Sequence, residues 1–315
     1  MTRNAPGREP WILRAADVEA DGRPILAELL GADYSARAIT AQRSDTAPDV
    51  VRQALARIAP WDARSQLDLA RWCIADHGNA GAIGAPTWEE AVRLIRRRAD
   101  EAFASERFVI ALGGDHSVTW PLAESAAAAA RVRHGQEARL GIIQLDIHHD
   151  VRPLDHGPSN GTPFRGLLET GVVRGDDLVQ VGIHPFANRR HLTEYCDEQR
   201  IRRFDLDEVA QLGPEATATA ALSALSGVHA IHLSIDIDVL DRASAPGTAA
   251  ALPGGLDPRT LQGIIEGVCA DPRVASIDVV EFDPERDVAD TTALNVALAI
   301  VAAVASLARR TMPPL

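Results

Sequence analysis

The sequence predicts an α/β fold in which a mainly parallel sheet is covered by helices on both faces. Continuous apolar segments of strand length alternate with segments of helical periodicity, and strands that are apolar throughout are typical of a parallel sheet buried on both sides. Several of these strands end in polar clusters, as expected where ligands bind such a sheet. No linker rich in Pro, Gly or Ser divides the chain, so we expect residues 1–315 to form one domain, with an irregular N-terminal segment at residues 1–20.

The predicted elements alternate along the chain. Short apolar runs predict strands at residues 25–33, 108–112, 140–145, 178–182, 201–204, 230–235 and 274–282. Apolar residues at helical spacing predict helices at residues 47–55, 87–104, 117–133, 163–170, 191–200, 214–225, 258–269 and 291–309. Thr87 is a candidate N-cap for the second helix, because Glu90 follows three residues later. Residues 62–76 show no clear period, and residues 78–86 read as a loop.

Charge and composition exclude several classes of partner. The formal net charge of −12, from 32 basic and 44 acidic residues, argues against binding to nucleic acid or to an anionic membrane. The three cysteines are far apart and form no Cys-x-x-Cys pair, which favours a reducing compartment. The N-terminus has no apolar core like that of a signal peptide, and the longest apolar run, residues 296–307, is shorter than a membrane span. We therefore expect a cytoplasmic protein that acts on a small molecule.

Four predicted strands are followed by conspicuous polar clusters. The clusters occupy residues 113–117 (Gly-Gly-Asp-His-Ser), 146–150 (Asp-Ile-His-His-Asp), 236–241 (Asp-Ile-Asp-Val-Leu-Asp) and 281–287 (Glu-Phe-Asp-Pro-Glu-Arg-Asp). In an open α/β sheet, ligands bind outside the carboxyl ends of the strands. The four clusters therefore point to one crevice, although they lie far apart in the sequence.

Spacing within the clusters predicts which side chains face one another. In an extended segment, residues two apart point the same way. Asp146 and His148 should therefore project together, and so should Asp236 and Asp238. Asp150 would join them if the chain stays extended, and would otherwise curl back from the loop.

These side chains, with His116 as a sixth, predict a metal centre. Four carboxylates beside two imidazoles would repel one another or carry a severe desolvation cost unless cations neutralised them. The oxygen-rich set without Cys suits manganese better than zinc, although zinc, cobalt and nickel stay open. Two ions about 3.5–4 Å apart, bridged by carboxylate and water, would satisfy four carboxylates and acidify the water into a nucleophile. His149 is out of phase with His148 and is not expected to be a ligand.

Each motif taken alone has a simpler interpretation. A single Asp-x-His or Asp-x-Asp is commonly a turn or a solvated loop, and the Gly-Gly-Asp-His-Ser segment could be a tight turn in which Asp115 or Ser117 caps the next helix. Only their joint occurrence at successive strand ends favours a metal centre.

The three motifs Gly-Gly-Asp-His-Ser, Asp-x-His-x-Asp and Ser-x-Asp-x-Asp-x-x-Asp, in this order, resemble those of the ureohydrolase family of arginases, agmatinases and formimidoylglutamases. The resemblance extends from about Gly31 to the C-terminal helix. It implies a three-layer α/β/α sandwich of the arginase type, two Mn²⁺ ions per subunit and a homo-oligomer. It also implies hydrolysis of a C–N bond at a guanidinium or formimidoyl carbon.

The resemblance assigns a role to each metal ligand. It implies that one ion is held by His116 and Asp150, the other by His148 and Asp238, and that both are bridged by Asp146 and Asp236. Glu281 matches the acid that pairs with the cationic head of the substrate, to which a carboxylate can accept two parallel hydrogen bonds. A plain role for Glu281 as a cap at the strand end stays open.

The loop after the second motif resembles the formimidoylglutamase branch. Asn160 stands where arginases and agmatinases have a histidine, and the Asp-x-Arg sequence ending at Arg152 with the later Gly-Thr pair is similar to formimidoylglutamases. Arg152 would attract a substrate carboxylate and repel an ammonium group, unless it pairs with Asp155 or points to solvent. Asn160 and Arg165 are candidates for binding the substrate's glutamate portion or for stabilising the loop.

The predicted activity is hydrolysis of N-formimidoyl-L-glutamate to L-glutamate and formamide, a step of histidine degradation. Catalysis would use Glu281 to orient the cationic head, while the proton donor to the leaving nitrogen stays open among Asp238, His156 and bulk water. The alternatives are an agmatinase or guanidinobutyrase that releases urea, a single-zinc deacylase, and a non-catalytic metal-binding paralogue.

Overall fold

A sheet of nine strands forms the centre of the computed structural model, which describes residues 11–312. Its strands are β1 (Ile12–Arg14), β2 (Ile25–Ala32), β5 (Cys73–Asn79), β6 (Phe108–Gly113), β7 (Leu140–Leu145), β8 (Leu178–Ile183), β9 (Arg202–Asp205), β10 (Ala230–Asp236) and β11 (Val274–Val280). Their order in the sheet is β1-β5-β2-β6-β11-β10-β7-β8-β9, and all neighbouring pairs are parallel. A separate antiparallel pair is formed by β3 (Trp61–Asp62) and β4 (Leu67–Asp68).

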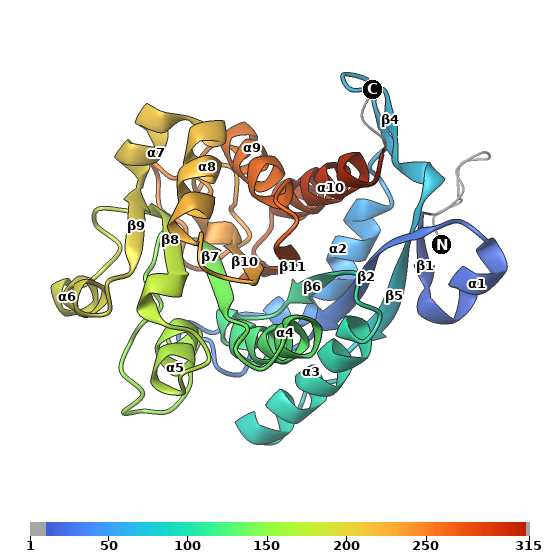
Figure 1. Cartoon of the computed structure of the whole chain (residues 1–315). Helices are drawn as coiled ribbons and strands as arrows, with labels where there is room; N and C mark the ends of the chain where they lie inside the picture. The colour runs from blue at the N-terminus through green and yellow to red at the C-terminus, as the bar shows by residue number, and fades with distance from the viewer. Residues whose placement is uncertain (1–10, 313–315) are drawn as a thin grey trace.

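Helices cover both faces of this sheet. The helices are α1 (Val18–Asp21), α2 (Ala47–Leu55), α3 (Trp88–Phe103), α4 (Thr119–His134), α5 (Pro163–Glu169), α6 (Arg190–Glu198), α7 (Leu206–Leu212), α8 (Pro214–Ala224), α9 (Pro258–Cys269) and α10 (Thr291–Thr311). Helices α2, α8, α9 and α10 pack on one face, and α3, α4 and α5 pack on the other (Figure 1). The predicted three-layer α/β/α architecture is confirmed.

The core follows from strands that are apolar along their whole length. Every residue of β7, β8 and β10 is buried, because helices cover both sides of these central strands. Helix α3 begins as predicted, with the Thr87 hydroxyl accepting a hydrogen bond from the backbone N–H of Glu90 at 3.2 Å.

Helix α10 is long and rich in apolar residues. Among residues 11–312, it alone is long and apolar enough to cross a membrane by length and composition. In the structure, however, 72% of its most apolar window is buried against the rest of the protein. The prediction of a buried helix here is confirmed.

Three parts of the secondary structure differ from the prediction. Strand β5 (Cys73–Asn79) lies where the sequence showed no clear period up to residue 76 and read as a loop from residue 78. The expectation of an irregular segment at residues 1–20 is wrong for its second half, because β1 pairs with β5 and α1 follows it; residues 1–10 lie outside the described residues. A three-residue strand is too short to give a readable period. Helix α7 is an additional element, capped by Asp205, whose side chain accepts a hydrogen bond from the backbone N–H of Glu208.

The strand order explains why the polar clusters meet. Strands β6, β11, β10 and β7 are consecutive neighbours in the sheet and run parallel. Their carboxyl ends therefore lie side by side along one edge. The chain segments that follow these four strands are the four predicted clusters.

Candidate metal centre and substrate pocket

The first group of metal-ligating side chains surrounds His116, which lies in a 3-10 turn directly after β6. Its Nδ1 atom is 2.8 Å from Asp150 Oδ2, 3.2 Å from Asp236 Oδ2 and 3.3 Å from Asp146 Oδ2. Asp150 reaches the group with a backbone φ of 49°, so the chain curls back at this residue rather than staying extended. Such a conformation is unfavourable for a non-glycine residue and is typical of functional sites.

The second group forms around His148. Its Nδ1 atom is 3.0 Å from Asp238 Oδ2 and 3.4 Å from Asp146 Oδ1. Asp146 thus offers one oxygen to each group, as a bridging ligand would. Asp236 offers an atom to the first group only, and its Oδ1 accepts a hydrogen bond from the backbone N–H of Asp238 at 2.8 Å. A bridging role for Asp236 stays a prediction.

The donor atoms of these two groups fit divalent metal ions. Within each group, the ligand atoms all lie within 4.8 Å of one another. His116 Nδ1 and Asp238 Oδ1 are buried and have no hydrogen-bond partner among the described residues, although a buried polar atom normally has one. A cation among these atoms would satisfy both, so the residues present fit a metal centre.

A hydrogen-bond chain behind His116 sets its tautomer. The hydroxyl of Ser234 donates to Asp278 Oδ1 at 2.7 Å, and it lies 3.1 Å from Nε2 of His116. Because the serine proton is used on Asp278, the serine oxygen accepts from an N–H at Nε2 of His116. Nδ1 then carries the lone pair that a metal ligand needs.

Burial opposes ionisation of the side chains in the centre, and neighbouring charges act with it or against it. It raises the pKa of Asp238 to about 6, although His148 acts in the other direction. Burial and the charges of Asp238 and Asp146 raise the pKa of Asp236 well above its ordinary value. Burial also disfavours protonation of His116, but its neighbouring carboxylates outweigh burial and raise the pKa of the imidazole. The centre therefore attracts positive charge, whether as protons or as metal ions.

Glu281 lies directly after β11 and is held by three donors. The backbone N–H of His116 donates to Oε1 at 2.6 Å, and the side chains of Asn160 and Gln42 donate to Oε1 and Oε2 at 3.1 and 2.8 Å. Burial raises the pKa of Glu281, while Gln42 and the other donors favour its charged form. Its backbone φ of 65° is a second unusual conformation at the site. Three donors from separate parts of the chain hold the Glu281 carboxylate, so Glu281 is more than a cap at the end of its strand.

Gln42 is a functional residue that the sequence did not reveal. It lies in the loop after β2, and its Nε2 contacts a carboxylate 239 positions later in the chain. No motif or period surrounds it. Asn160, in contrast, was a candidate for substrate binding, and its side chain contacts Glu281 and accepts from the backbone N–H of Ile39 at 2.9 Å. The side chain of Asn160 therefore lies at the cavity with Glu281 as a direct partner, and its role in binding substrate stays a prediction.

A cavity of about 190 Å³ opens above the metal-ligating groups. Its walls include Asp150, Asp236, Asp238, Glu281, Asn160 and Arg152. The stem of Arg152 lies over Gly161, where an added Cβ would be 2.6 Å from the arginine Cδ. Arg152 is exposed, and its guanidinium forms no ion pair or hydrogen bond with any of the residues that the structure describes. The alternative pairing with Asp155 is not found, and Arg152 lines the cavity as an unpaired cation.

Three other sequence candidates lie outside this cavity. Arg165 stacks on Tyr195, with Cζ 3.7 Å from the ring centroid, and pairs with Glu169, so its role in binding substrate is not supported. His156 is exposed and does not line the cavity. His149 is not a ligand, as predicted, because its Nδ1 lies 2.8 Å from Gln180 Oε1 instead.

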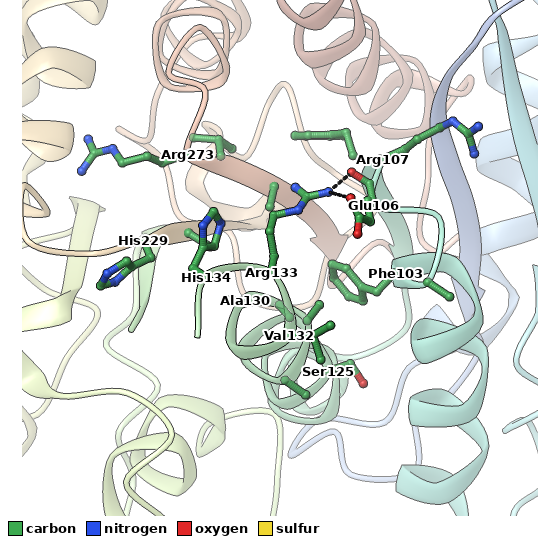
Figure 2. A pocket seen from close by; sticks show the side chains of 18 of the residues that line it. Phe103, Glu106, Arg107, Ser125, Ala130, Val132, Arg133, His134, His229 and Arg273 are labelled. Atoms are coloured by element: carbon green, nitrogen blue, oxygen red, sulfur yellow. Dashed lines mark hydrogen bonds and ion pairs between the residues drawn. The ribbon is translucent and has the colours of Figure 1, made fainter. Parts of the chain in front are cut away.

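A larger cavity of about 710 Å³ lies at the opposite edge of the sheet, where β6, β10 and β11 begin (Figure 2). Arg133 points toward Glu106 there, 3.5 Å from Oε2, and Arg107 pairs with Glu28 at 2.9 Å. None of the metal-ligating side chains lines this cavity. Its cationic groups are already paired, so its size does not make it the reactive site.

Comparisons with known proteins agree with this centre. The arginase family model matches residues 27–305. The formimidoylglutamase of Halalkalibacterium halodurans is 34% identical over 92% of this chain and 90% of its own length. The guanidinopropionase of Pseudomonas aeruginosa is 31% identical over 76% of this chain and 70% of its own length.

Solved structures extend the similarity to the fold. Formimidoylglutamase from Bacillus subtilis superposes with a TM-score of 0.86, at 26% identity, over 99% of this chain and 97% of its own. A Trypanosoma cruzi formiminoglutamase structure with Mn²⁺ shares the fold, with a TM-score of 0.81 at 21% identity over 96% of this chain and 99% of its own. The chain belongs to the arginase family and is a metal-dependent hydrolase.

Proposed function

We propose that this protein hydrolyses N-formimidoyl-L-glutamate to L-glutamate and formamide and thereby serves histidine degradation. The observation that carries the proposal is the position of Arg152, whose unpaired guanidinium shares one cavity with the metal-ligating carboxylates and Glu281. A substrate with a cationic head and an anionic tail fits this charge distribution. Relatives named formimidoylglutamase at 34% and 29% identity support the choice.

The site residues would hold two Mn²⁺ ions. His116, Asp150 and Asp236 with one oxygen of Asp146 would hold the first, and His148 with Asp238 and the other oxygen of Asp146 the second. The metal pair would supply water that is activated for attack at neutral pH. The set of four carboxylates and two imidazoles suits Mn²⁺.

The chain's own residues would bind the substrate and move protons. Glu281 would orient the cationic formimidoyl group, since three donors hold its carboxylate at the cavity wall. Water oxygen bonds to the formimidoyl carbon, the bond from that carbon to the glutamate nitrogen breaks, and the leaving nitrogen gains a proton. Asp238 would carry this proton, because its side chain lines the cavity beside the carboxylates of Asp150 and Asp236.

A guanidino acid hydrolase is the second candidate. Its substrate would also present a cationic head and a carboxylate, and the similarity to guanidinopropionase at 31% identity supports it. An agmatinase is less favoured, since agmatine ends in an ammonium group that Arg152 would repel. Release of urea rather than formamide distinguishes this class.

Replacement of Arg152 tests the proposal. For the Mn²⁺-loaded protein, we expect Arg152→Ala to raise the KM for N-formimidoyl-L-glutamate about tenfold or more, with a smaller change in kcat, because a charge-assisted contact is lost in ground state and transition state alike. Arg165→Ala is the matched control, since that guanidinium is engaged outside the cavity. An unchanged KM in Arg152→Ala would contradict the proposal that Arg152 binds a carboxylate in the substrate tail.

The cellular setting is part of the same proposal. The protein would be a cytoplasmic homo-oligomer that acts on a small molecule. The net charge of −12 supports the part of this proposal that excludes nucleic acid and anionic membranes as partners. The three cysteines are buried and unpaired, which supports a reducing compartment.

A further inference from the structure

A second arginine, Arg189, lines the same cavity as Arg152. It lies in the loop between β8 and α6, whereas Arg152 belongs to the loop after β7. Both arginines are exposed, and neither guanidinium forms an ion pair or hydrogen bond within residues 11–312. The motifs that identify the metal ligands do not include Arg189.

The loop that carries Arg189 is fixed to the metal-binding loop. The side chain of Asn188 accepts a hydrogen bond from the backbone N–H of His149 and donates one to the carbonyl of Ile147, both at 2.9 Å. The Nε2 atom of His149 lies 3.1 Å from the Thr193 hydroxyl in α6. These contacts span the residues on both sides of Arg189, so its backbone has a defined position relative to the metal ligands.

The acidic side chains of the cavity are buried or half-buried, whereas its two arginines are exposed. The acidic side chains that line it are three metal-ligating carboxylates and Glu281, which faces the substrate head. No further carboxylate lines the cavity to neutralise the guanidinium groups of Arg152 and Arg189. Two free guanidinium groups at one cavity mouth suit a ligand with two anionic groups, because each can hold a carboxylate through paired hydrogen bonds.

We infer that Arg189 binds the α-carboxylate of the substrate, which a 4-aminobutyrate tail lacks, while Arg152 binds the distal carboxylate. The pair would thereby restrict the site to amidines with a dicarboxylate tail. This inference rests on the proposed function and specifies how the glutamate portion is recognised. The Arg189 side chain acts in binding and selectivity rather than in the bond-breaking step.

The first test compares two tails in kinetic assays. In Arg189→Ala, we expect the KM for N-formimidoyl-L-glutamate to rise about tenfold to a hundredfold with kcat little changed, as for loss of a charge-assisted contact. The KM for the monocarboxylate analogue N-formimidoyl-4-aminobutyrate should stay within about twofold. Arg189→Lys should fall between wild type and Arg189→Ala, because lysine keeps the charge but loses the planar fork.

The neighbouring arginine supplies a matched control. Arg190 has a side chain that is 91% exposed, pairs with Glu194 at 2.7 Å and does not line the cavity. Arg190→Ala should leave both KM values unchanged. The inference is overturned if Arg189→Ala leaves the KM for the dicarboxylate within about twofold, matches Arg190→Ala, or raises the KM for both tails equally.

A second test does not depend on which substrate the enzyme uses. Glutarate and butyrate are compared as inhibitors of whichever reaction the Mn²⁺-loaded wild type performs, and their binding is measured by calorimetry. Glutarate should bind about tenfold more tightly than butyrate, and Arg189→Ala should remove this preference. If wild type releases only urea from a guanidino acid, the proposed function fails, but a lost glutarate preference still supports the role of Arg189. Equal binding of both anions to wild type overturns it.

Discussion

The side-chain amide of Asn160 lies 3.1 Å from Oε1 of Glu281, and the same oxygen accepts the backbone N–H of His116 at 2.6 Å. One hydrogen-bond network therefore joins the loop that carries Arg152 to the acid that faces the substrate head and to a metal-ligating histidine. Asn160 thus acts through Glu281 as a positioning residue. A change in the loop that carries Asn160 should therefore also change how the Glu281 carboxylate is held.

Replacing Asn160 by aspartate removes the donor to Glu281 while keeping the shape of the side chain. A second carboxylate would then face Glu281 across a short distance, so we expect the kcat/KM of Asn160→Asp to fall about tenfold to a hundredfold through repulsion and loss of a charge-assisted bond. The acceptor for the Ile39 N–H is retained in this variant. Steady-state kinetics against wild type measures the change.

Asn295→Asp is the control for this prediction. Its side chain donates to the carbonyl of Ser244 at 2.9 Å and does not line the substrate cavity. We expect its kcat/KM to stay within about threefold of wild type. Equal losses in the two variants would contradict a specific link between Asn160 and Glu281.

Gly161→Ala should displace Arg152. The added Cβ would be 2.6 Å from the arginine Cδ, closer than non-bonded carbons approach, and the flexible arginine stem is the part that can move. We expect the KM to rise about as much as in Arg152→Ala, and the double variant Gly161→Ala/Arg152→Ala to show no further increase. Additive losses in this double-mutant cycle would show that Gly161 acts elsewhere.

Asp146 and Asp238 should differ in how many ions their loss removes. Asp146 contacts both histidines of the centre through separate oxygens, whereas Asp238 contacts His148 alone. We expect Asp146→Ala to lose both ions and Asp238→Ala to retain about one per chain. Metal content after dialysis, measured by mass spectrometry, gives the answer. Two retained ions in Asp146→Ala would contradict its bridging position.

Removal of metal should lower the thermal stability of the protein. The centre places three buried carboxylates and the half-buried Asp150 close together, so cations relieve repulsion only in the folded state. At Mn²⁺ concentrations about a hundredfold above Kd, each site contributes about 2.7 kcal/mol to the free energy of unfolding. We expect Tm to fall by several degrees after chelation and to recover on adding Mn²⁺. A Tm independent of Mn²⁺ would argue against occupied sites in the folded chain.

Most of the metal centre could be predicted because its residues lie within five positions of the ends of apolar strands. The strand ends and the two-residue spacing placed Asp146 beside His148 and Asp236 beside Asp238, as the structure shows. The adjacency of β6, β11, β10 and β7 could only be inferred from the general rule for α/β sheets. The left-handed backbone at Asp150 depends on tertiary contacts and had no signal of its own.

The loops around the substrate were harder to predict. Gln42 and Arg189 lie in segments without a periodic pattern, and their importance arises from contacts that the folded chain creates. Helix α7 did have a signal, since Asp205 precedes Glu208 by three residues in the manner of a capping box. Arg165 follows closely after the loop residues that line the cavity, yet its stacking on Tyr195 could not be foreseen from the sequence.

The most direct test of the central claim is identification of the product released from N-formimidoyl-L-glutamate by the Mn²⁺-loaded protein. Carbon-13 NMR of substrate labelled at the formimidoyl carbon would follow that carbon, with 4-guanidinobutyrate and agmatine assayed in parallel for urea. We predict formamide in amounts equal to the L-glutamate formed, and no comparable release of urea. Urea from a guanidino compound without formamide would contradict the assigned substrate while leaving the metal centre in place.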